Sequence, residues 1–103
     1  MFRRARFGEL VGRQLDLFAQ EQRYVLEEAE EKLRLYNAAE RAEAEELYGD
    51  YVDAVETGAD ALADLRDHYA RSLEEAEAET YAAEFNRAAS RRFPRFADAL
   101  EHT

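Results

Sequence analysis

Apolar residues recur at intervals of three and four along nearly the whole chain, and they form three separate stripes. In chain order, the stripes occupy residues 7–36, 44–73 and 78–100. Because an α-helix has 3.6 residues per turn, residues at these intervals lie on one face of a helix. The pattern predicts helices near residues 6–37, 41–71 and 76–92, each with one side against a common core.

The ends of these helices are predicted from three local signals. Asn37 lies where the first stripe loses phase, and asparagine can adopt the left-handed conformation that closes a helix. Ser72 and Glu75 have the spacing of a capping box at a new helix start. Pro94 has no amide hydrogen and disfavours helical angles in the residue before it. The third helix should therefore end or kink near Arg92, with a short helical tail after Pro94.

The sequence predicts an all-α chain. Because short connections join antiparallel neighbours, the predicted topology is an antiparallel up-down-up three-helix bundle with two long helices and a shorter third helix. Its 103 residues fit a single helical domain spanning 1–103. Charges favour this order, because it brings Arg3, Arg4 and Arg6 near the acids of 74–79, and the arginines of 87–95 near the acids of 40–50. The short third helix leaves part of the hairpin formed by the first two uncovered.

Individual side chains can be assigned to the core or to the solvent from their place on the stripes. We expect the apolar side chains of Phe18, Val55, Leu62 and Phe85 to be buried. We expect the carboxylates of Asp53, Asp60 and Asp64 to be exposed to solvent. Gly58 lies within the second stripe, where glycine costs ~1 kcal/mol relative to alanine. Close approach of another backbone or of a large ring, such as Phe18 or Phe85, would explain it.

Composition narrows the class of protein. The formal net charge of −10 argues against binding to duplex DNA or to anionic membranes. The chain has no cysteine, and no apolar stretch approaches the ~20 residues that span a bilayer. We therefore expect a cytoplasmic protein with no membrane partner.

The candidate chemical groups do not form a recognisable site. Neither His68 nor His102 has a glutamate three residues before it, as a ferritin-like diiron site requires. The polar groups aligned on the second helix, Asp53, Asp60, Asp64, Asp67 and His68, lie nearly opposite its apolar stripe, as in a solvated face. We expect no catalytic residue, metal ligand, cofactor or small-molecule substrate, and no enzyme activity. A ferritin-like carboxylate metal-binding protein or enzyme is the alternative.

The sequence favours a helical protein-interaction module that associates with itself as a homodimer, or with another helical protein. Leu10, Leu17 and Tyr24 form a second stripe at seven-residue spacing on the first helix, and Phe93 and Phe96 lie near the end of the chain. These five residues are the predicted interface. A second alternative is a nucleic-acid binder, because arginines alternate with Phe93 and Phe96 in the C-terminal segment. No motif identifies a family.

Overall fold

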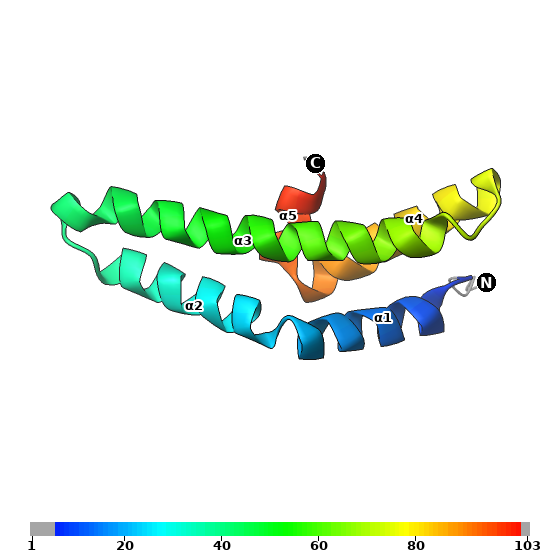
Figure 1. The fold of residues 1–103 in the computed structure, drawn as a ribbon, viewed down its shortest axis with the longest axis horizontal. Helices are drawn as coiled ribbons and strands as arrows, with labels where there is room; N and C mark the ends of the chain where they lie inside the picture. Colours follow the sequence, from blue (N-terminus) through cyan, green and yellow to red (C-terminus); the bar gives the residue numbers. More distant parts are fainter. Residues whose placement is uncertain (1–5, 102–103) are drawn as a thin grey trace.

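The computed structural model describes residues 6–101, and the regular structure in this range is entirely helical. The helices are α1 (Gly8–Glu21), α2 (Arg23–Ala38), α3 (Arg41–Ala70), α4 (Glu75–Arg92) and α5 (Pro94–Glu101) (Figure 1). The all-α prediction is confirmed, as a sequence rich in good helix formers and poor in glycine and proline would suggest. The three-helix up-down-up bundle is not confirmed, because the described residues form five helices.

The predicted first helix is divided in two at Gln22. The backbone of Gln22 has φ −105° and ψ 23°, outside the helical range. Hydrogen bonds continue on both sides of it: the Gln22 amide donates to the Phe18 carbonyl at 2.8 Å, and the Leu26 amide donates to the Gln22 carbonyl at 3.0 Å. The bend lets α1 pack against α4 while α2 packs along α3. Without a proline or glycine at the bend, the apolar periodicity carried no sign of it.

The loop between α2 and α3 lies where the sequence predicted it, but its conformation is different. Ala39 and Glu40 are extended, with ψ values of 148° and 159°. None of the described residues has a positive φ, so the left-handed conformation expected at Asn37 is wrong. An extended pair of residues turns the chain instead.

The capping box predicted at Ser72 is also wrong. The Ser72 hydroxyl donates to the Tyr69 carbonyl at 2.6 Å, so this serine belongs to the end of α3. α4 starts at Glu75 after an extended Glu74. The prediction for Pro94 is confirmed: α4 ends at Arg92, and Pro94 is the first residue of α5, where an amide hydrogen is not needed.

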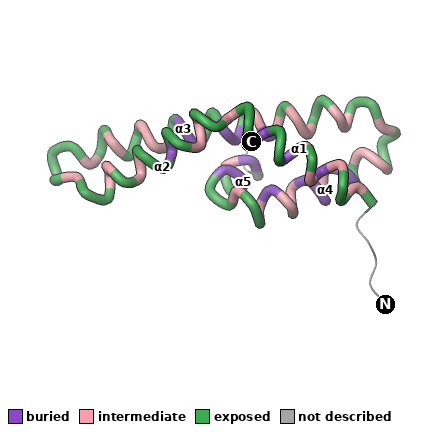
Figure 2. Tube along the Cα trace, turned by 90° about the horizontal axis from the view of Figure 1, so that it is seen from below, coloured by how far each residue is buried: buried purple, intermediate pink, exposed green. Residues whose placement is uncertain are grey.

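The hydrophobic core lies where α1, the first half of α2, α4 and α5 meet the middle and second half of α3 (Figure 2). Its largest fully buried side chains are Val11, Leu15, Leu62, Tyr81, Phe85 and Leu100. The prediction of which side chains are buried and which are exposed is confirmed. Phe18, Val55, Leu62 and Phe85 are buried, and Asp53, Asp60 and Asp64 are exposed. The apolar stripes therefore identified the core faces correctly, although the helix count was wrong.

Gly58 is buried against a ring, as expected, but the ring belongs to Phe96. A Cβ atom at this position would overlap Cδ1 and Cε1 of Phe96. Phe96 is 5% exposed and lies on α5, which folds back onto α3. The missing side chain of Gly58 thus lets α5 approach the middle of α3.

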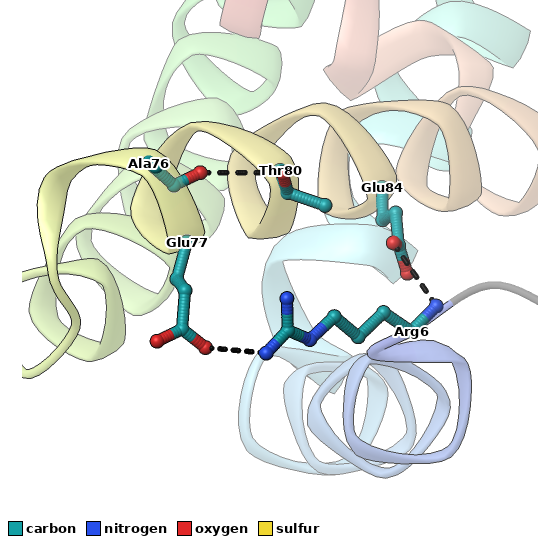
Figure 3. Close-up of polar contacts among 5 residues, drawn as sticks. All are labelled: Arg6, Ala76, Glu77, Thr80 and Glu84. Carbon is teal, nitrogen blue, oxygen red and sulfur yellow. Dashed lines mark hydrogen bonds and ion pairs between the residues drawn. The ribbon is translucent and has the colours of Figure 1, made fainter.

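The start of α1 is fixed to α4 by polar contacts (Figure 3). The carboxylate of Glu84 is 8% exposed and accepts hydrogen bonds from the backbone amides of Arg6 at 3.1 Å and Phe7 at 2.8 Å. The Arg6 guanidinium contacts Glu77 at 2.9 Å. The predicted approach of arginines at the chain start to acids at the start of the third stripe is confirmed for Arg6, whereas Arg3 and Arg4 lie outside the described residues.

Candidate protein-interaction surface

One end of the molecule consists of two helices only. α2 and the first part of α3 extend beyond α1, α4 and α5, at the left of Figure 1. The molecule measures 51 × 28 × 22 Å, and its radius of gyration is 15.8 Å, whereas a compact domain of this length has about 13 Å. We call residues 30–53 the hairpin arm. Within it no residue is buried, in contrast to the rest of α3 (Figure 2).

The hairpin arm carries large apolar side chains that the core does not use. Tyr51 packs against the core. The other large apolar side chains of the arm neither belong to the core nor pack against it; they are Leu33, Leu35, Tyr36, Leu47, Tyr48 and Val52. Tyr48 is 49% exposed, and the others are half-buried. A two-helix hairpin can cover only the sides that its helices turn toward each other, so the remaining apolar surface of the arm faces solvent.

Three tyrosines order part of this surface. The ring of Tyr48 lies 5.1 Å from the ring of Tyr36 on α2 and 6.1 Å from that of Tyr51 on α3, measured between centroids. The Lys32 ammonium also lies 3.7 Å from the Asp50 carboxylate across the two helices. These contacts hold the hairpin arm together, and the tyrosine rings present a pre-ordered apolar face.

The apolar face continues into a groove at the base of the arm. The groove, of about 690 Å³, lies between α3 and α5. Its apolar lining comes from Tyr48, Tyr51, Val52 and Val55 on one side and from Pro94 and Ala99 on the other, and its charged lining is Glu56, Arg95 and Asp98. α5 covers α3 around Gly58, and Arg41 at the start of α3 is ~25 Å farther along the helix. The third layer of helices therefore ends before it reaches the far end of the arm.

Two groups of opposite charge flank this face. We call residues 40–46 the arm tip; its acids Glu40, Glu43, Glu45 and Glu46 are exposed and outnumber its one cation, Arg41. We call Arg87 and Arg91, in the last turns of α4, and Arg95, in the first turn of α5, the junction arginines; of the three, Arg95 lines the groove. All three are exposed, and none of them forms an ion pair within residues 6–101.

The expected pairing of the C-terminal arginines with the acids of 40–50 is therefore wrong within one chain. Arg92 instead contacts Asp16 of α1 at 2.6 Å. The reason is length, because α4 ends at Arg92 beside the middle of the molecule and the arm tip lies beyond it. The complementary charges are thus present but unused in the single chain.

The predicted interface residues fall into two groups. Leu17 and Tyr24 are 48% and 76% exposed, and we call them the outer pair. Leu10 is half-buried against the core. Phe93 packs edge-on against Phe18, with ring centroids 5.1 Å apart, and Phe96 is buried beside Gly58. Phe96 was predicted to be an accessible contact residue. It is instead a core residue, because α5 folds onto its own chain. Leu33, Tyr36 and Tyr48 were missed as a surface because they belong to stripes that were predicted to face the core, whereas Leu35, Leu47 and Val52 lie beside those stripes.

The candidate metal-binding and polar residues of the described chain do not come together in one site. Within residues 6–101 no three histidine, aspartate or glutamate side chains are grouped so as to hold a metal ion. The aligned polar residues of α3 are exposed: Asp53, Asp60, Asp64, Asp67 and His68. His102 lies outside the described residues. Phe96 is buried, whereas half-buried Phe93 packs against Phe18 and lines a surface pocket with Arg92 and Arg95.

The titratable groups in the interior join helices to one another. The Tyr81 hydroxyl donates to Gln14 Oε1 at 2.7 Å, which links α4 to α1. Burial of Tyr81 raises its pKa to about 12, and the hydrogen bond with Gln14 opposes that shift. The Glu84 carboxylate of α4 likewise accepts hydrogen bonds from the backbone amides that precede α1. These hydrogen bonds satisfy polar groups that packing removes from water.

No described helix is both long enough and apolar enough to cross a bilayer. No protein-family model, curated protein or solved structure shows significant similarity to this chain.

Proposed function

We propose that this chain is a non-enzymatic helical interaction module of the cytoplasm, and that it associates with itself as a homodimer through the hairpin arm. The observation that carries the proposal is the set of large apolar side chains in the arm that lie outside the core. Soluble monomers rarely leave a contiguous apolar face uncovered, and such faces commonly mark contacts with other proteins. A second hairpin arm offers a matching apolar face of the same length.

The size of the arm limits the strength of this contact. The α3 part of the arm, from Arg41 to Asp53, is ~20 Å long, which places an arm-to-arm contact at the small end of specific interfaces. The net charge of −10 per chain also opposes association. We therefore expect a dissociation constant of ~10 μM, with the tyrosines at the centre of the contact.

The outer pair provides a second candidate surface on the same chain, so the experiment compares the two. Sedimentation velocity is recorded from ~1 to ~100 μM for the native chain and for two double variants, a concentration range that spans weak specific interfaces. One variant, Tyr48→Ser/Val52→Ser, removes apolar contacts from the arm. The other, Leu17→Ser/Tyr24→Ser, removes a matched pair of exposed apolar side chains from α1 and α2. Far-UV circular dichroism checks that both variants remain helical.

We expect the native chain and the outer-pair variant to dimerise, and the arm variant to remain a monomer. Loss of the dimer in the outer-pair variant alone would assign the contact to Leu17 and Tyr24. A native chain that is still a monomer at ~100 μM would contradict self-association. Another helical protein would then be the better candidate for the same apolar face.

A further inference from the structure

We infer that the two hairpin arms pack antiparallel, with the arm tip of each protomer seated on the junction arginines of the other. This arrangement rests on the proposed self-association and adds its orientation and its electrostatic contact. The occupant of the groove at the base of the arm is then the arm tip of a second copy. Two hairpins side by side would form a four-helix bundle from α2 and α3 of both chains.

Charge complementarity is the first reason for this arrangement. The arm tip carries four exposed glutamates and one arginine, and it is the strongly acidic end of the apolar face. Arg95 lines the groove at the other end of that face, together with Glu56 and Asp98. Arg87, Arg91 and Arg95 have no ion-pair partner within residues 6–101. The three junction arginines outnumber the two carboxylates of the groove. A partner that brings acids to this end of the face and arginines to the arm tip therefore complements the excess charge at both ends, and the chain itself is such a partner.

Symmetry is the second reason. In a two-fold dimer the same surface is used by both copies. If the two-fold axis runs along the arms, the arms are parallel and the two acidic arm tips lie side by side. If the axis is perpendicular to the arms, the arms are antiparallel and each tip lies beside the base of the other arm. Like charges at close range are unfavourable, so the acidic tips favour the antiparallel order.

The extent of the apolar face is the third reason. The arm alone provides a small contact, whereas the groove between α3 and α5 extends the face past Tyr48 and Val52 to Pro94 and Arg95. An antiparallel partner places its arm tip in this groove and buries both segments. A parallel partner leaves the groove open and relies on the arm alone.

Charge reversal separates this contact from general repulsion between acidic chains. Glu45→Arg/Glu46→Arg makes the net charge less negative, so repulsion alone predicts tighter association. The antiparallel contact predicts the opposite, because the new arginines would face the partner's junction arginines. Asp60→Arg/Asp64→Arg is the matched control, since it changes the net charge equally at two exposed positions of α3 outside the groove and the arm.

The experiment measures the dimer dissociation constant by sedimentation equilibrium for four proteins besides the native chain. These are Glu45→Arg/Glu46→Arg, Arg91→Glu/Arg95→Glu, the combination of both pairs, and the Asp60→Arg/Asp64→Arg control. We expect each of the first two variants to weaken dimerisation about tenfold, because the symmetric contact occurs twice. The combined variant should recover to within about threefold of the native value, and the control should not weaken the dimer.

Each other outcome overturns the antiparallel contact. If the tip variant dimerises as tightly as the Asp60 and Asp64 control, or if the combined variant does not recover, the dimer does not join the arm tip to the junction arginines. In that case the proposed self-association still stands. If the native chain does not dimerise, the self-association fails, and the antiparallel contact fails with it.

Discussion

Replacing Gly58 by alanine tests the packing of α5 on α3 with a control in the same helix. In an exposed helix interior, Gly→Ala stabilises by up to ~1 kcal/mol. Gly49 is such a position, because it lies in α3 and a methyl group added there would have nothing within 4 Å of it. At Gly58 the same methyl group would overlap the near edge of the Phe96 ring, which is buried and cannot swing into solvent.

Overpacking of this kind costs about 1–3 kcal/mol. After subtraction of the ~1 kcal/mol gain in helix propensity, we expect Gly58→Ala to destabilise the chain by up to about 2 kcal/mol and to lower its melting temperature by up to about 9 °C. Gly49→Ala should stabilise by about 0.5–1 kcal/mol. Urea unfolding followed by circular dichroism at ~1 μM protein, where association contributes little, measures both variants.

A double-mutant cycle identifies the ring that Gly58 accommodates. Phe96→Leu removes ring atoms that the new methyl group would meet. It should therefore cost less in the Gly58→Ala background than in the native chain, by about 1 kcal/mol. If both glycine variants shift stability in the same direction, or if the two substitutions are additive, Phe96 does not pack against Gly58 as described.

Three further predictions concern the core and its polar groups. Leu62→Ala should reduce the free energy of unfolding by about 2–5 kcal/mol and Asp60→Ala by less than about 0.5 kcal/mol in chemical denaturation, and equal effects would mean that α3 faces the other way. Glu84→Gln keeps the size of the side chain but weakens two hydrogen bonds to the start of α1, so calorimetry should show a loss of about 1–2 kcal/mol, and an unchanged melting temperature would contradict this role. Absorbance at alkaline pH should show one phenol ionising near 12, absent in Tyr81→Phe. Because the unfolded chain releases that proton near pH 10, the free energy of unfolding should fall between pH 10 and 12, and a simultaneous titration of all tyrosines would contradict the burial.

The core faces and most helix ends could be predicted from local patterns. The apolar stripes identified Leu62 and Phe85 as buried, because burial on a helix follows its period. Pro94 marked the end of α4, because its ring and missing amide act within two residues. Features that depend on distant contacts were not predictable in this way. The bend at Gln22 follows from the different partners of α1 and α2, and no residue at the bend disfavours a helix.

The candidate surface could be predicted only in part for the same reason. Exposure of Leu17 and Tyr24 agrees with a stripe that lies off the core face. Tyr48 and Val52, however, have the same spacing as the buried Val55 and Leu62 farther along α3. Whether such a residue is covered depends on where α4 and α5 end in space. The sequence showed that the third layer was too short, but it did not show which part of the hairpin remained open.

Hydrogen exchange as a function of protein concentration tests the role of the hairpin arm most directly. Mass spectrometry compares deuterium uptake at ~1 μM and at ~200 μM, on either side of the dissociation constant expected for a small interface. We predict slower exchange at high concentration in peptides from residues 30–53, with little change in peptides containing Leu17 and Tyr24. Exchange in residues 30–53 that is the same at both concentrations, or protection confined to the outer pair, would contradict self-association through the hairpin arm.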